Sequence, residues 1–194
     1  MRLGARPSLG SGRAAGGLLL ALVLVGTAGG RAFAALTEGS VLTDDWRVPV
    51  ADLKGATLDL RDEILLPGAP EDGGATLLVF WATWCEPCIH EIPVLNELHK
   101  YYAKSGLKLL GVGMSQGGDT LKSISEAASR HGMAYRVLFD GEGKAREAFG
   151  VLALPAAALI DRRGVVRWSG PSLPPDINAR IKSALAPQKD SGSK

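Results

Sequence analysis

Two cysteines, Cys85 and Cys88, are the residues of this chain whose type and spacing most directly indicate chemistry. They are the only cysteines among 194 residues, and they stand three positions apart in Trp84-Cys85-Glu86-Pro87-Cys88. A small exported domain that used disulfides for stability would carry several spaced pairs, and a bond across two residues constrains little chain entropy. We therefore predict a redox-active pair that alternates between dithiol and disulfide.

The segments on either side of the motif predict how it is held. Residues 75–81 form a continuous apolar run, which is typical of a strand buried on both faces. From Cys85 onward apolar residues recur every three or four positions, so a helix is predicted to about residue 105, before Gly106 stops it, with a bend at Pro93. Cys85 would then lie at the N-terminus of the helix, where unpaired N–H groups and the macrodipole lower the pKa of a thiol. Cys88, one turn later, could resolve the mixed disulfide that Cys85 forms.

Further along the chain, strand-like and helix-like segments alternate. Apolar pieces within 40–50 and 57–60 suggest a hairpin. Asp119 can cap a helix that carries Leu121, Ile124 and Ala128 and ends near Gly132. Other strands are expected at 107–114, 135–139, 156–160 and 165–168, and other helices at 144–149 and 174–185. This order predicts an α/β sandwich around a mixed central sheet flanked by helices.

The first 34 residues have the composition of a secretory signal. Three arginines and no acidic residue precede the apolar run 18–28, and Ala32-Phe33-Ala34 offers a cleavage site before Ala35, with Ala28 as a second possibility. The run is shorter than the roughly 20 residues that span a bilayer, so we expect cleavage. The protein is expected in the periplasm or another extracytoplasmic space, in contact with the membrane only if the leader remains as an anchor.

The rest of the chain has the length of one domain. We expect an N-terminal extension at 35–74, a core domain at 75–186 and a disordered tail at 187–194. Removal of the four arginines of the leader changes the formal net charge from +2 to −2. The mature chain therefore lacks the basic surface that a nucleic-acid partner requires.

The segment 79–88, Val-Phe-Trp-Ala-Thr-Trp-Cys-Glu-Pro-Cys, resembles the active-site segment of thioredoxin-fold proteins. The next residues, 89–95, resemble the exported TlpA/ResA-like branch of thiol-disulfide oxidoreductases, and the similarity extends to about Leu185. It implies a thioredoxin-like sandwich without cofactor or metal. It also implies a membrane dithiol donor and exported disulfide substrates such as apocytochrome c or copper-assembly proteins. By this resemblance Leu154-Pro155 is a cis-proline unit packed against the cysteines, and the expected substrate contacts are Trp84, Pro87, Leu154 and Pro155.

Two departures from the family pattern concern substrate choice and proton transfer. Ala156–Ala158 replaces the usual Thr-Thr-Phe, so no hydroxyl or aromatic ring is offered there. Val79 stands where thioredoxin has a buried Asp, so we predict that Glu86 takes or gives the proton as Cys88 reacts. Glu91 is assigned to the helix surface, as are the three histidines, His90, His99 and His131.

Other uses of a Cys-x-x-Cys motif fit less well. Zinc normally takes four ligands, and His90 brings the count only to three. Attachment of haem requires His directly after the second cysteine, where this chain has Ile89. Two alternatives to thiol-disulfide exchange stay open: a thiol peroxidase acting through Cys85, and a copper carrier that uses the two soft sulfurs. The peroxidase lacks the usual Pro-x-x-x-Thr-x-x-Cys pattern. A reductant is preferred to an oxidant because Glu86 would oppose a nearby thiolate.

Overall fold

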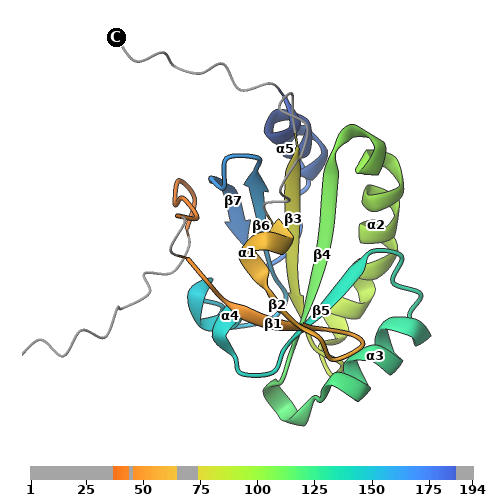
Figure 1. The fold of residues 1–194 in the computed structure, drawn as a ribbon. Coiled ribbons are helices and arrows are strands. Elements are labelled where there is room, and N and C mark those ends of the chain that lie inside the picture. Colours follow the sequence, from red (N-terminus) through yellow and green to blue (C-terminus); the bar gives the residue numbers. More distant parts are fainter. Residues whose placement is uncertain (1–36, 44–45, 65–73, 187–194) are drawn as a thin grey trace, which may run out of the picture. The chain divides into compact units, whose positions relative to one another are not determined.

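A computed structural model describes residues 37–43, 46–64 and 74–186; the predicted leader and C-terminal tail lie outside them. Within these ranges the strands form one mixed sheet in the order β2-β1-β5-β4-β3-β6-β7 (Figure 1). The strands are β1 (Pro49–Asp52), β2 (Thr57–Asp59), β3 (Ala75–Trp81), β4 (Leu107–Met114), β5 (Arg136–Asp140), β6 (Ala156–Asp161) and β7 (Val166–Gly170). The helices are α1 (Leu60–Ile64), α2 (Glu86–Tyr102), α3 (Leu121–Arg130), α4 (Lys144–Ala148) and α5 (Ile177–Leu185), with 3-10 turns η1 (Ala103–Ser105) and η2 (Gln116–Gly118).

Strand β3 is the central element of the sheet. It pairs in parallel with β4, Leu78 opposite Leu110, and antiparallel with β6, Leu78 opposite Ala158. All of its residues are buried, as its unbroken apolar sequence predicts. Its side chains alternate between two cores, since Leu78 and Phe80 belong to one and Leu77 to the other. The strand therefore joins both halves of the sandwich and ends directly before the cysteine motif.

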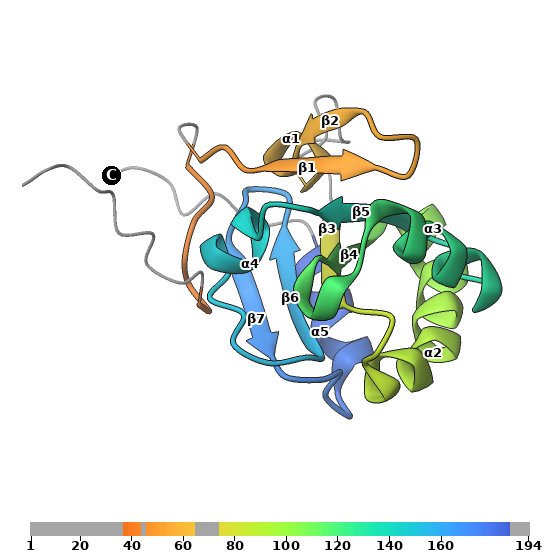
Figure 2. The ribbon, with the colours of Figure 1, turned by 90° about the horizontal axis from the view of Figure 1, so that it is seen from below.

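Helices cover both faces of the sheet, which confirms the predicted sandwich (Figures 1 and 2). Apolar residues of α2, α3 and α5 pack on one face, and residues of α1 and α4 pack on the other. The alternation of buried and exposed positions along α2 places Ile92, Leu95 and Leu98 against the sheet.

The predicted N-terminal extension continues the same sheet. β1 and β2 form the expected hairpin, and β1 pairs with β5, Ala51 opposite Phe139. The strand expected over 40–50 is much shorter, because only its last two residues belong to β1. Ahead of it Leu42, Trp46 and Val48 fold into the core beside Leu78, and α1 follows β2 where no helix was predicted. Without this hairpin β5 would be an edge strand of the sheet, and its pairing with β1 protects its backbone groups.

Several element ends differ from their sequence predictions. α2 runs through Pro93 as one helix and then tightens into η1, and the helical segment ends before Gly106 as predicted, where φ is 92°. Asp119 was expected to cap α3, and that is wrong. The cap is Thr120, whose hydroxyl accepts the Ser123 N–H while the Ser123 hydroxyl accepts the Thr120 N–H. Asp119 instead turns its carboxylate toward Thr83, 36 residues away in sequence.

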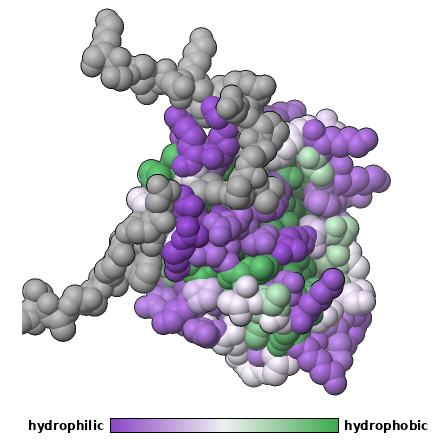
Figure 3. Space-filling model, in the orientation of Figure 1, coloured by the Kyte–Doolittle hydropathy of each residue, from purple (hydrophilic) through white to green (hydrophobic). Residues whose placement is uncertain are grey.

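The surface carries mostly polar side chains, with smaller apolar areas between them on the face shown in Figure 3. His90 and His131 are exposed as expected, but His99 is half-buried, with its ring 6.5 Å from that of Tyr135. Residues 161–164 form the turn between β6 and β7, in which the carboxylate of buried Asp161 accepts the N–H groups of Arg163 and Val165. In the part of the chain that the structure describes, no helix combines the length and apolarity needed to cross a membrane.

Gly113 in β4 tests how tightly α3 packs on the sheet. A Cβ at this position would lie 2.7 Å from two side-chain carbons of Ile124, which is fully buried. We expect Gly113→Ala to lower the free energy of unfolding by about 1–3 kcal/mol, because the core has no room for the methyl group. Urea denaturation measures the loss. In an Ile124→Ala background the same substitution should cost much less, and equal costs in both backgrounds would contradict the packing argument.

Candidate active site

The two cysteines are bonded to each other at the start of α2. Their Cα atoms are 5.3 Å apart, as one helical turn requires. Cys85 is the N-cap of α2, and its sulfur accepts the backbone N–H of Cys88 at 3.3 Å. Both residues are buried, with exposed fractions of 3% and 4%, so exposure does not distinguish their roles. The capping position does, because a negative charge on the Cys85 sulfur is favoured by the free N–H groups of the first turn.

The local sequence produces this geometry in a few residues. Where β3 ends, the N–H of Cys85 bonds the carbonyl of Ala82 at 3.1 Å and closes a tight turn. Helix α2 then begins, with the N–H of Ile89 bonded to the carbonyl of Cys85 at 3.1 Å. Pro87 falls in the first turn of the helix, where its missing N–H leaves no partner unsatisfied. A buried strand followed by a proline-started helix therefore places the first sulfur at the helix end.

Trp84 and Pro87 lie beside the disulfide on the solvent side. Pro87 is exposed, and the Trp84 side chain is exposed over about half its surface, 53%. Its indole Nε1–H donates to the carbonyl of Gln116 at 2.7 Å, which fixes the ring against the segment after β4. Trp81, in contrast, is 2% exposed and belongs to the core, as predicted.

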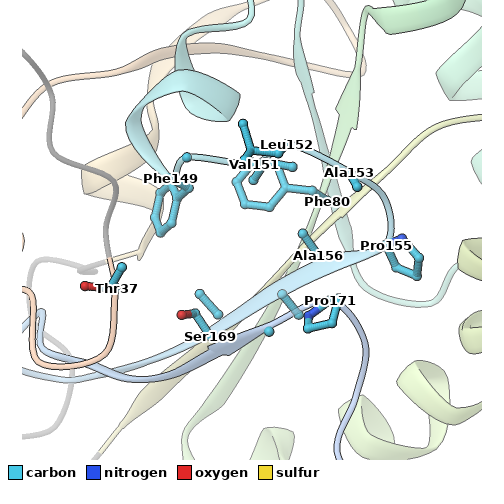
Figure 4. A pocket seen from close by; sticks show the side chains of 14 residues that line it. Thr37, Phe80, Phe149, Val151, Leu152, Ala153, Pro155, Ala156, Ser169 and Pro171 are labelled. Carbon is cyan, nitrogen blue, oxygen red and sulfur yellow. The ribbon is translucent and has the colours of Figure 1, made fainter.

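The loop before β6 comes close to the cysteines. The Leu154–Pro155 peptide bond is cis, and Leu154 packs against the apolar cluster that contains Cys85 and Cys88. Pro155 lines a neighbouring cavity of about 300 Å³, whose walls are largely apolar (Figure 4). The other lining residues include Phe80, Phe149, Val151, Leu152 and Ala156. The small side chains of 156–158 leave this space beside the cis-proline loop open.

Two glutamates follow the cysteines on α2 in different surroundings. Glu86, the predicted proton carrier, is the first residue of the helix and is exposed. Glu91 was assigned to the helix surface, but it is half-buried, and its carboxylate accepts the N–H of Leu173 at 3.2 Å. Burial raises the pKa of Glu91, and the hydrogen bond from Leu173 opposes this only in part. Glu91 lies one turn after Cys88, a spacing at which side chains on a helix are neighbours.

The fold and the disulfide at the start of α2 define an oxidoreductase of the thioredoxin class. The model of the AhpC/TSA family matches residues 47–169, so the chain belongs to that family, and within it to the TlpA/ResA-like branch predicted from the motif.

Individual relatives agree with this placement. The thiol-disulfide oxidoreductase ResA of Geobacillus kaustophilus is 34% identical over 136 residues, which are 69% of this chain and 72% of that protein. ResA of Geobacillus thermodenitrificans is 34% identical over 113 residues, and the chain spans 63% of its length, slightly under two thirds. Among solved structures, the thioredoxin domain of a thiol-disulfide oxidoreductase from Bacteroides vulgatus is 18% identical, with a TM-score of 0.62 over 78% of this chain and 99% of that one. At 18% identity, this similarity shows that the two proteins share a fold.

The raised pKa of Glu91 predicts a pH-dependent stability. A carboxyl whose pKa is higher in the folded than in the unfolded chain stabilises the fold fully below its unfolded value and loses this contribution as the pH rises through the folded value. We expect Glu91→Gln, which can still accept the Leu173 N–H, to unfold at increasingly higher urea concentration than the parent as the pH rises above about 4.5. Urea titrations between pH 3 and 8 measure this difference, and a difference that does not change with pH would contradict the argument.

Proposed function

We propose that this chain is an exported thiol-disulfide oxidoreductase that reduces disulfides in other exported proteins. The single observation that supports this most strongly is the position of Cys85 as N-cap of α2, with Cys88 one turn away and bonded to it. The names of the relatives support the same reaction, since the two ResA proteins are called thiol-disulfide oxidoreductases. Export is supported by the arginine-containing, then apolar, order of the first 34 residues.

The reaction proceeds by two thiol-disulfide exchanges. The Cys85 thiolate attacks one sulfur of the partner's disulfide; that S–S bond breaks, and the other partner sulfur leaves as a thiolate that takes up a proton. Cys88 then loses its proton, and its thiolate attacks the Cys85 sulfur. The mixed disulfide breaks, and the second partner thiol is released. Two electrons have then moved to the partner, and the Cys85–Cys88 pair is left as the disulfide described above.

The second exchange needs a group that takes the proton from Cys88. Val79 offers none, and Glu86 is exposed at the end of the helix. Glu91 is better suited, since it is half-buried one turn after Cys88 and burial raises its pKa, which makes its carboxylate a stronger base. The sequence alone predicted Glu86 as the group that takes this proton. From the structure we propose Glu91 as the preferred proton acceptor.

We infer the direction of electron transfer from the carboxylate next to the pair. Glu86 directly follows Cys85, and a carboxylate disfavours a nearby thiolate. A less stabilised thiolate makes the pair a better reductant, because a stabilised reduced form is what makes an oxidant. The pair must then be reduced again after each turnover, for which we propose a membrane dithiol donor. Apocytochrome c and copper-assembly proteins are the proposed substrates.

The cavity beside Pro155 supports a contact with an extended substrate segment. Its volume of about 300 Å³ and apolar walls suit a large apolar side chain next to the substrate cysteine. Leu152, a lining residue that is 90% exposed, and Trp84, which is 53% exposed, offer further apolar surface to a partner. Substrate recognition is therefore assigned to Trp84, Pro87, Leu154 and Pro155, as predicted, with the cavity as an additional feature.

Trapping of the mixed disulfide tests the roles of the two cysteines. We expect Cys88→Ser to accumulate a covalent complex with its natural partner, because the resolving thiol is missing, and Cys85→Ser to accumulate none. Non-reducing electrophoresis of extracytoplasmic extracts, followed by mass spectrometry, detects and identifies the complex. Capture by Cys85→Ser instead of Cys88→Ser would reverse the assigned roles.

Two further assays separate the proposed function from the alternatives. The parent should catalyse insulin reduction by a dithiol. Consumption of hydrogen peroxide at a comparable rate would favour a peroxidase. Tight Cu(I) binding without insulin reduction would favour a copper carrier.

The two glutamates can be distinguished by single-turnover kinetics. With a model mixed disulfide on Cys85, we expect Glu91→Gln to slow release of the partner thiol by about tenfold or more at pH 7, since general-base catalysis contributes this much or more. The matched variant Glu86→Gln should stay within about twofold of the parent by the same measure. Stopped-flow detection of the released thiol gives both rates. The reverse order of the two effects would return the proton-transfer role to Glu86.

A further inference from the structure

The two residues before Cys85 are both bonded to the segment that follows β4. The Thr83 backbone N–H donates to the Asp119 carboxylate at 2.8 Å, and the Thr83 hydroxyl donates to it at 2.6 Å. Trp84 donates its indole N–H to the carbonyl of Gln116 at 2.7 Å. Because Cys85 closes a turn onto Ala82, these bonds fix the short connection on which the first sulfur is carried.

Asp119 precedes α3 but is not needed to cap that helix. Thr120 and Ser123 form the capping box of α3 between themselves. The Ser123 hydroxyl also donates to the Asp119 carboxylate at 2.9 Å, so one half-buried carboxylate accepts two bonds from Thr83 and one from Ser123. Hydrogen bonds to an ionised acceptor are among the stronger ones, and two from one residue also fix its orientation.

The same segment fits closely against Trp84. Gly117 has φ +75°, and a Cβ there would lie 2.4 Å from the indole Nε1, so no larger residue can occupy this position without moving the ring. Gln116 and Asp119 therefore hold consecutive residues of the active-site connection from one side. Thr83 and Trp84 can therefore shift only together with residues 116–119.

We propose that Asp119 is a positioning residue of the redox centre: through Thr83 it holds Cys85 at the N-terminus of α2 and so sets the thiolate reactivity of Cys85. This inference rests on the proposed function of the pair. The free N–H groups of a helix stabilise a charge only within about the first turn, so a displaced sulfur loses part of this stabilisation. Asp119 acts by geometry and not by its charge, which would oppose the thiolate.

The test is the pH dependence of Cys85 alkylation in the fully reduced chain, measured by mass spectrometry with iodoacetamide. We expect Asp119→Ala to raise the pH midpoint and to slow alkylation at pH 7 by about fivefold. Asp119→Asn should stay within about twofold of the parent. Its amide can accept the Thr83 N–H and donate to the hydroxyls of Thr83 and Ser123, so it keeps the contacts without the charge. Equilibration with glutathione should show Asp119→Ala as the stronger reductant by a similar factor.

Thr120→Ala is the matched structural control. It removes the cap of the same helix, so it should lower the unfolding temperature, but it leaves the Thr83–Asp119 bonds intact and should not move the midpoint. Thr83→Val supplies a second variant if Asp119→Ala does not fold, and should raise the midpoint by a smaller amount. In the Asp119→Ala background it should add no more than a small further shift, because the two residues act through one contact.

Three results would overturn the proposal. The first is an unchanged midpoint in Asp119→Ala and Thr83→Val. The second is a lower midpoint in both Asp119 variants, which would assign the effect to charge. The third is an equal shift in Thr120→Ala, which would indicate general loosening of α3. Alkylation reports on the chain alone, so a parent that alkylates normally but reduces no protein disulfide would contradict the proposed function and not this inference.

Discussion

The placement of one sulfur at the end of a helix is the constraint on which the rest of this molecule depends. The Cys88 N–H points at the Cys85 sulfur only because Cys85 is the N-cap of α2, and α2 begins there only because β3 ends four residues before Cys85. The position of β3 is in turn fixed by burial on both faces and by pairing with β4 and β6. A small reactive centre thus requires the whole sandwich, since a strand that could shift in register would move the sulfur with it.

Much of this architecture follows from the local pattern of the sequence. The β3 run, the period of α2 and Gly106 after η1 are set by neighbouring residues, so they were predicted close to their observed bounds. α1 and the buried course of residues 46–48 were not predicted. Trp46, Val48 and Val50 alternate with Arg47 and Pro49 in the period of a strand, but only the last part of this segment pairs as β1. Trp46 and Val48 are ordered by contacts with the core formed mainly by later strands. Tertiary packing, and not local preference, decides such segments.

The residues of the active site likewise fall into those that the local sequence predicts and those that only the tertiary structure brings together. The cysteine pair, Trp84 and Leu154-Pro155 are visible in the sequence because motif and family resemblance mark them. Asp119 was misassigned because an acidic residue before an apolar helix is the ordinary pattern of a cap. Its actual partner lies across the fold, and so does Leu173, which pairs with Glu91 over 82 positions. Only the packing of α2, α3 and the loop before α5 brings these groups together, and no spacing rule contains that information.

Burial of the cysteines is compatible with access for a protein partner, because the residues on the protein side of the disulfide differ from those on its solvent side. Toward the protein, Ile124, Ala127 and Leu154 lie in the apolar cluster that contains both cysteines. Toward the solvent, Trp84 presents an indole ring whose N–H is already bonded to Gln116. A ring held in this way offers apolar surface without loss of side-chain entropy on binding, whereas a freely rotating ring would lose it. If Trp84 contacts the partner as proposed, the segment after β4 contributes to recognition as well as to geometry, since it orders the apolar surface before a partner arrives.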